Sequence, residues 1–196
     1  MTYNFDEIID RRNTNSENVE GWRPYIFHCG PERVFPYKDE EFIRMWVADM
    51  EFAVAPEILQ AITDRVHRRI LGYTLVYDKG YYEVLRAWCE SRYGWSFPKE
   101  QLTFSPGVIP ALYQLTEDLV KPLNGKVLTM TPAYGFFLHA CEYNGVELVT
   151  SPLREENGRF SVDWEDLEAK AADPDVKLLM LCNPHNPTGR IWTEDE

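Results

Sequence analysis

The pattern of hydrophobic and polar positions in the second half of the chain predicts strands that alternate with helices. Short apolar runs typical of strands occur at residues 126–130, 146–150 and 177–182. Helical spacing of apolar residues at 133–143 and 162–172 separates these runs. The last run lies between turn-forming residues, so we expect its strand to be buried on both faces, as in a parallel sheet. This alternation predicts an α/β fold, in which helices flank a parallel-type sheet.

The first half of the chain is less regular but contains three helical patterns. Pro56 favours a helix start, and apolar residues then recur every four positions until Gly72 ends the pattern. Helices are also predicted at 81–93 and 108–119. Two short apolar segments predict further strands, at 42–47 and 102–104.

The last residues predict the start of another helix. Thr193 and Glu196 have the spacing of a capping box, which marks a helix N-terminus. A parallel strand–helix pattern that stops at this point would leave its sheet incomplete. We therefore expect a truncated domain.

The composition is that of a folded protein. Of the 196 residues, 44% are hydrophobic and 14% are aromatic, which is more than a disordered chain carries. The formal net charge of −12 argues against nucleic acid or an anionic membrane surface as the main partner. No apolar stretch reaches the length of about 18 residues that a membrane-spanning helix needs. The start of the chain also lacks the pattern of a signal peptide.

The cysteines and histidines predict a reduced protein without a metal site. The four cysteines lie far apart and form no Cys-x-x-Cys pair, which a reducing, cytoplasmic compartment explains most simply. The four histidines form no cluster with them, so no metal is expected. We expect His139 on a helix surface and His185 on the solvent side of a loop.

Two loops that follow predicted strands are candidate binding sites. Residues 183–189 form a rigid Asn-Pro-His-Asn-Pro-Thr-Gly loop at the carboxyl end of a strand, where ligands bind in open α/β sheets. Asn186 offers a neutral donor there, but a connector that binds nothing explains this loop equally well. Gly107 stands between a predicted strand and a helix, where free backbone amides can bind an anion. The residues alone favour an ordinary turn at Gly107.

A third candidate is Tyr134, which directly follows a predicted buried strand. An aromatic ring at the carboxyl end of a strand can stack on a planar cofactor. A place in the core or at its rim is the more common role of a tyrosine, and the chain has 11 of them.

Five motifs occur in the order and approximate spacing of one enzyme family. They are Trp46-Val-Ala-Asp-Met-Glu-Phe52, Gly72-Tyr73, Ser105-Pro-Gly-Val-Ile109, Thr131-Pro-Ala-Tyr134 and Asn183-Pro-His-Asn-Pro-Thr-Gly189. With them the chain resembles the fold-type-I enzymes that depend on pyridoxal 5′-phosphate (PLP), the aspartate aminotransferase superfamily. Within the class I/II aminotransferases it is similar to the N-terminal half of cystathionine β-lyases of the MalY/PatB type, from about Phe5 to its last residue.

The resemblance implies a domain organisation. Residues 1–49 would be the N-terminal arm and loops of the small domain. Residues 50–196 would be the N-terminal part of the large PLP-binding domain, which is incomplete in this chain.

The resemblance also implies the roles of individual residues around PLP. The backbone amides of Val108 and Ile109 would bind the phosphate of the cofactor. Tyr134 would cover the pyridine ring, and Asn186 would donate a hydrogen bond to the 3′-oxygen of that ring. Tyr73 would reach the phosphate of the neighbouring subunit's cofactor, so the enzyme would be a homodimer with shared active sites.

On the substrate side, the resemblance implies that Ala48 and Asp49 line the entrance. The residues themselves allow a second interpretation, in which Asp49 caps the turn before Pro56. No catalytic residue is assigned in this chain, because its seven lysines lie outside the family's Schiff-base lysine motif. They are Lys38, Lys79, Lys99, Lys121, Lys126, Lys170 and Lys177.

The implied activity of the intact family member is a C–S β-lyase reaction on a sulfur-containing amino acid. Cystathionine or cysteine would give pyruvate, ammonia and a thiol. The alternatives are a PLP-dependent aminotransferase and an inactive fragment or regulatory module without catalysis. Because the Schiff-base lysine is not found, we expect the chain by itself to be inactive. The expected location is the cytoplasm.

Overall fold

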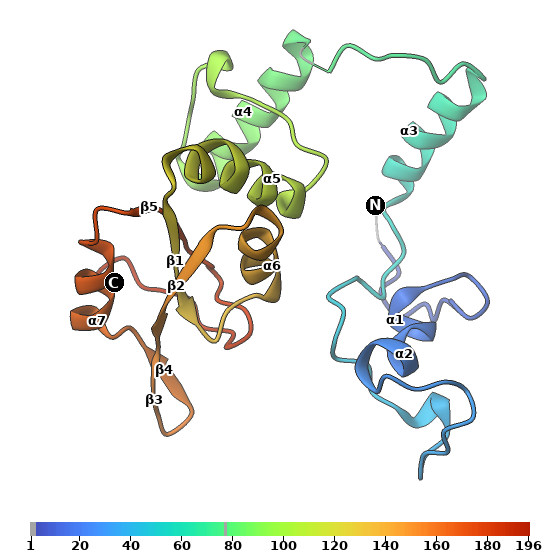
Figure 1. Cartoon of the computed structure of the whole chain (residues 1–196). Coiled ribbons are helices and arrows are strands. Elements are labelled where there is room, and N and C mark those ends of the chain that lie inside the picture. Colours follow the sequence, from blue (N-terminus) through green and yellow to red (C-terminus); the bar gives the residue numbers. More distant parts are fainter. Residues whose placement is uncertain (1–2, 77) are drawn as a thin grey trace. The chain divides into compact units, whose positions relative to one another are not determined.

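The chain divides into two compact units, Met1–Val76 and Tyr77–Glu196, in a computed structural model that describes residues 3–76 and 78–196 (Figure 1). The predicted boundary between residues 49 and 50 concerns the small and large domains of the family. These units do not test that boundary, and it stays a prediction.

The first unit consists of short helices and loops. Its helices are α1 (Glu17–Glu20), α2 (Trp22–Ile26), the 3₁₀-helix η1 (Asp39–Glu41) and α3 (Pro56–His67). The helix predicted behind Pro56 is therefore confirmed as α3, with the proline at its first position.

The strand predicted at 42–47 is wrong, because no described residue of this segment belongs to a sheet. Its aromatic side chains pack locally instead. The ring of Phe42 lies 4.9 Å from that of the buried Trp22, and the ring of Trp46 lies 5.1 Å from that of Tyr25. Aromatic packing therefore accounts for the apolar positions that the sequence suggested would form a strand.

The second unit begins with helices. They are α4 (Lys79–Tyr93), the 3₁₀-helix η2 (Lys99–Gln101), α5 (Val108–Leu115), the π-helix η3 (Thr116–Val120) and the 3₁₀-helix η4 (Lys121–Leu123). The helices predicted at 81–93 and 108–119 are confirmed, although the second changes its pitch at Thr116. The strand predicted at 102–104 is wrong, because these described residues are assigned to no strand, and the ring of Phe104 lies 5.0 Å from that of Tyr81.

A parallel sheet follows, as the alternating pattern predicted. Its strands are β1 (Lys126–Thr131), β2 (Glu147–Pro152) and β5 (Val176–Met180), in the order β2-β1-β5. Both neighbours run parallel to β1, and Leu128 pairs with Val149 on one side and with Leu179 on the other. A small antiparallel hairpin, β3 (Arg154–Glu156) and β4 (Arg159–Ser161), follows β2.

Helices cover both faces of this sheet. They are α6 (Gly135–Asn144) and α7 (Trp164–Ala171) together with α5. Figure 1 shows α7 on one side of the sheet, and α5 and α6 on the other. Because β1 has a strand on each side and helices over both faces, its four central residues, 127–130, are buried. The core beside α6 consists of Val120, Val127, Phe137, Ala140, Cys141 and Met180.

The expectation that the last strand is buried on both faces is wrong. In β5, Met180 is buried, but Leu179 is 48% exposed, and Leu181 just beyond the strand is 56% exposed. The reason is position, because β5 forms one edge of the described sheet. Among the described residues, no helix has both the length and the apolar character needed to cross a membrane.

Candidate functional site

The carboxyl ends of β1 and β5 lie at the same edge of the sheet, because the two strands are parallel neighbours. The first strand leads into Tyr134, and the second leads into the loop that contains Asn186. Two of the residues predicted to contact a cofactor therefore follow adjacent strand ends. In open α/β sheets this edge is where ligands bind.

Tyr134 is held half-buried at the start of α6. It is the N-cap residue of that helix, and its ring lies 5.3 Å from the ring of Phe136 and 6.0 Å from that of Phe137. It packs against the buried core beside α6, as does Cys182 after β5. The tyrosine is thus both a rim residue of the core and a ring at a strand end.

In the loop 183–189, Asn186 is exposed and His185 is buried. The backbone N–H of Asn186 donates to the sulfur of Cys182 at 3.2 Å, while the Asn186 side chain is exposed. His185 is only 2% exposed, so its expected place on the solvent side is wrong. Its Nδ1 lies 2.9 Å from the hydroxyl of Thr188, and burial lowers its pKa. His139, in contrast, lies exposed on α6 beside Glu142, as predicted.

The N-terminus of α5 offers backbone amides to an anion. Val108 is the first residue of the helix and is exposed, and the amides of a first helical turn have no acceptor within the helix. Ile109 follows it and is half-buried. Gly107 precedes them in an extended conformation, where an added Cβ would meet only Pro110 Cδ, at 3.5 Å. The hydroxyl of Ser105 donates to the Gly107 carbonyl at 2.8 Å and fixes this turn.

In the first unit, Asp49 is fixed by the N-terminal arm. Its carboxylate forms an ion pair with Arg11 and accepts a hydrogen bond of 2.6 Å from the side-chain amide of the buried Asn18. The guanidinium of Arg11 lowers the pKa of Asp49, and Asn18 adds to this effect. The N-cap residue of α3 is Ala55, which makes no side-chain hydrogen bond, and the second interpretation of Asp49, as a cap of the turn before Pro56, stays a prediction. Ala48, beside Asp49, is exposed.

Tyr73 also belongs to the first unit, and its side chain is fully exposed. The predicted site residues thus divide between the units. Tyr73, Ala48 and Asp49 lie in the first, and Val108, Ile109, Tyr134 and Asn186 lie in the second.

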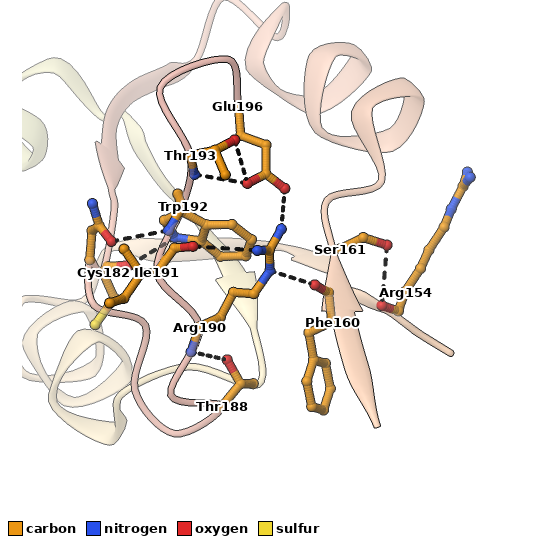
Figure 2. A network of polar contacts seen from close by, with 11 residues as sticks. Arg154, Phe160, Ser161, Cys182, Thr188, Arg190, Ile191, Trp192, Thr193 and Glu196 are labelled. Carbon is orange, nitrogen blue, oxygen red and sulfur yellow. Dashed lines mark hydrogen bonds and ion pairs between the residues drawn. The ribbon is translucent and has the colours of Figure 1, made fainter. Parts of the chain in front are cut away.

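Two residues that the sequence reasoning missed stabilise the end of the Asn186 loop (Figure 2). The indole N–H of Trp192 donates to the carbonyl oxygen of Cys182 at 3.0 Å. Arg190 donates from Nε to the carbonyl of Phe160 at 2.8 Å and forms an ion pair with Glu196. No local signal predicts these contacts, since they join segments that the fold brings together.

The expected capping box at Thr193 is half formed. The carboxylate of Glu196 accepts from the backbone N–H of Thr193 at 2.9 Å and from its hydroxyl at 3.0 Å. The described residues after Thr193 do not form a helix.

The side chains at this sheet edge and the amides of α5 fit PLP by their chemistry. Free first-turn amides on α5 suit a phosphate, and the ring of Tyr134 suits a planar pyridine. The exposed amide of Asn186 suits an anionic ring oxygen. The open space beside Gly107 leaves room for a group to approach the backbone.

Comparison with known proteins agrees with this chemistry. The family described as aminotransferase class I and II matches residues 40–196. Cystathionine beta-lyase PatB of Bacillus subtilis (strain 168) is 40% identical over 152 residues, which cover 78% of this chain and 39% of PatB. Protein MalY of Escherichia coli (strain K12) is 27% identical over 194 residues, which cover 99% of this chain and 47% of MalY.

The structural comparison extends the likeness to the fold. The PLP-bound C-S lyase from Staphylococcus hominis superposes with a TM-score of 0.85 and 43% identity, over 100% of this chain and 46% of that one. This similarity confirms the predicted fold-type-I α/β architecture. The chain spans less than half the length of each of these three proteins. Because the family match covers most of its residues, the chain belongs to the class I and II aminotransferases.

Proposed function

We propose that this chain is the N-terminal portion of a PLP-dependent C–S β-lyase that acts on a sulfur-containing amino acid. The observation that carries the proposal is the adjacency of β1 and β5, whose carboxyl ends lead to Tyr134 and Asn186. The similarity to the PLP-bound C-S lyase of Staphylococcus hominis over the whole chain supports it.

In this proposal the second unit holds the cofactor. The backbone amides of Val108 and Ile109 bind its phosphate, the ring of Tyr134 covers its pyridine ring, and Asn186 donates to its 3′-oxygen. When bound, PLP supplies an electron sink for the charge that develops at the α-carbon of the substrate. The chain's own residues orient that ring and stabilise the negative charge on its oxygen.

The first unit contributes the substrate entrance and the subunit contact. Ala48 and Asp49 line the entrance, and the Arg11–Asp49 ion pair supports this by holding the segment in one conformation. Tyr73 reaches the phosphate in a second subunit, so the enzyme is a homodimer with shared active sites. The full exposure of Tyr73 leaves its hydroxyl available for that contact. The four free cysteines are compatible with a cytoplasmic location.

The Schiff-base lysine lies outside this chain in the proposal. Lys126 and Lys177 stand at the amino-terminal ends of β1 and β5, at the edge of the sheet opposite Asn186. Lys126 pairs with Asp173 at 2.9 Å, and Lys177 donates to the Pro174 carbonyl at 2.5 Å. The side chain of Lys79 lies outside the described part of the chain. We therefore propose that the chain by itself is inactive.

The test is an assay of the full-length protein, purified with PLP and supplied with cystathionine or cysteine. A β-lyase consumes one water and releases pyruvate, ammonia and a thiol in equal amounts, without any 2-oxo acid acceptor. The family match makes transamination the second candidate. Amino-group transfer that requires an added 2-oxo acid, with no thiol released, would establish transamination and contradict the lyase proposal.

A further inference from the structure

Trp192 lies beyond the Asn-Pro-x-Asn-Pro-Thr-Gly motif, yet it is bonded to the start of that motif. Its indole N–H donates to the carbonyl oxygen of Cys182 at 3.0 Å, across 10 positions of sequence. Its backbone N–H donates to the side-chain oxygen of Asn183 at 3.3 Å. The residue therefore closes the loop between its two ends, as Figure 2 shows for the Cys182 side.

The ring of Trp192 also packs against the side chains of His185 and Arg190. It meets the ring of His185 edge to face, with the ring centres 5.5 Å apart, and the guanidinium of Arg190 lies 4.9 Å from its centre. The buried His185 is bonded to Arg190 through its backbone N–H at 2.6 Å and to Thr188 through its ring at 2.9 Å. The residue that directly precedes Asn186 is thus held on several sides.

The backbone of Asn186 is bonded to this arrangement, whereas its side chain is not. Its side chain is exposed, so the neighbouring side chains do not enclose it. Its backbone N–H is bonded to the sulfur of Cys182, whose own carbonyl oxygen is held by Trp192. A displacement of Trp192 would therefore release both the Cys182 peptide and the His185 ring. These two residues adjoin Asn186: Cys182 accepts its backbone N–H, and His185 precedes it in the sequence.

We propose that Trp192 is a positioning residue that directs the side-chain amide of Asn186 to the cofactor. This inference rests on the proposed function, in which that amide donates to the 3′-oxygen of PLP. Trp192 acts through Asn186 and does not itself touch the cofactor. Its effect on the cofactor should therefore disappear when Asn186 is already absent.

The experiment uses the full-length protein loaded with PLP and compares Trp192→Phe with Asn186→Ala. Phenylalanine keeps an aromatic ring against His185 but removes the N–H donor to Cys182. The matched control is Trp164→Phe on α7, where the tryptophan is exposed. Asn183→Ala tests the same loop closure without changing the ring, because it removes the acceptor of the Trp192 backbone N–H.

Two readouts separate positioning from general stability. The first is the midpoint of the pH titration of the cofactor's visible absorption band. This midpoint should rise in Trp192→Phe, because a less well directed Asn186 amide stabilises the negative charge on the 3′-oxygen less. The rise should be smaller than in Asn186→Ala. The double variant should match Asn186→Ala alone, because the two residues act in series. The second is hydrogen exchange of the peptide 182–190, which should become about fivefold faster in Trp192→Phe, as expected from the loss of one hydrogen bond.

The outcomes distinguish this inference from the proposed function. If Asn186→Ala raises the midpoint but Trp192→Phe and Asn183→Ala leave it unchanged, Trp192 does not position Asn186, and the proposed function stands. If none of the variants moves the midpoint, Asn186 does not contact the cofactor oxygen, and the inference fails together with that assignment. A shift in Trp164→Phe equal to that in Trp192→Phe would also overturn it.

Discussion

The hydroxyl of Thr129 donates a hydrogen bond of 2.9 Å to the carbonyl oxygen of Met180, 51 positions later in the sequence. Both residues are buried, and they are paired in register on β1 and β5. The bond therefore ties together the two strands that lead to Tyr134 and Asn186.

Replacing Thr129 with Val should destabilise the protein, because valine keeps the shape of the side chain but removes the donor to a buried carbonyl oxygen. The loss of such a buried bond costs about 1–3 kcal/mol. Thr129→Ser keeps the hydroxyl and serves as the control. Urea denaturation of the full-length protein measures the difference, and an unchanged midpoint in Thr129→Val would show that the bond does not contribute.

Replacing Tyr134 with Ala should weaken the retention of PLP. A stacking contact is worth roughly 0.5–1.5 kcal/mol beyond its buried area, which corresponds to about a 2- to 13-fold loss of affinity. Tyr134→Phe keeps the ring and should retain PLP. Visible absorbance after stepwise ultrafiltration measures the bound fraction. Equal retention in the Ala and Phe variants would mean that the ring does not cover the cofactor.

The Arg11–Asp49 ion pair should make the first unit sensitive to acid. Arg11 lowers the pKa of Asp49 in the folded state, so the folded protein binds this proton less readily than the unfolded chain. The stabilisation is therefore present above the ordinary aspartate pKa of about 3.9 and is lost as the pH falls through the lower, folded-state pKa. The stability difference between the wild type and Asp49→Asn should be constant from pH 7 to 5 and shrink below pH ~4. Equilibrium denaturation at each pH tests this, and a difference that grows towards acid pH would contradict it.

The 196-residue chain should form no specific covalent adduct with PLP. Borohydride reduction in the presence of PLP, followed by peptide mass spectrometry, should find no lysine modified in a one-to-one ratio. The full-length protein serves as the positive control, with one modified lysine beyond residue 196. A single stoichiometric adduct within the chain, accompanied by turnover, would refute the proposal that the chain by itself is inactive.

Cys141 should resist alkylation in the folded protein. Burial raises the pKa of its thiol to about 11, with a smaller effect from Glu142, and its residue is 1% exposed. Because the thiolate is the reactive form, iodoacetamide at pH 8 should label the half-buried Cys29 before Cys141. Labelling both at the same rate would indicate that α6 opens readily. Denatured protein provides the reference rate.

The sequence was sufficient to predict the elements whose pattern is local. The apolar stripe behind Pro56 and the helical spacing at 162–172 depend only on near neighbours. The structure has α3 at the first and α7 at the second, where the Asp163 side chain accepts from the backbone N–H of Asp166 and caps the helix. The spacing at 133–143 corresponds to α6, which ends at Gly145 with a left-handed φ of 66°, a conformation that glycine adopts readily.

The predictions that were wrong concern features that depend on partners distant in the sequence. A segment such as 42–47 becomes a strand only if another strand pairs with it. Its aromatic side chains instead pack against the rings of Trp22 and Tyr25. His185 stands among turn-forming residues, and its burial depends on Trp192, which packs on it only after the loop has turned back. For the same reason, the sequence predicted Asn186 as a candidate but could not predict what holds it.

The central place of β1 has a consequence for synthesis on the ribosome. Strand β1 emerges before both of its neighbours, and β5 is the later of the two. At ~5–20 residues per second, the roughly 45 residues between Thr131 and Val176 take ~2–9 s to translate. Strand β2 is itself made within that interval, and until β5 follows, the other edge of β1 stays open, where a strand of another nascent chain can pair. Slower translation of this stretch should therefore reduce the yield of correctly folded protein.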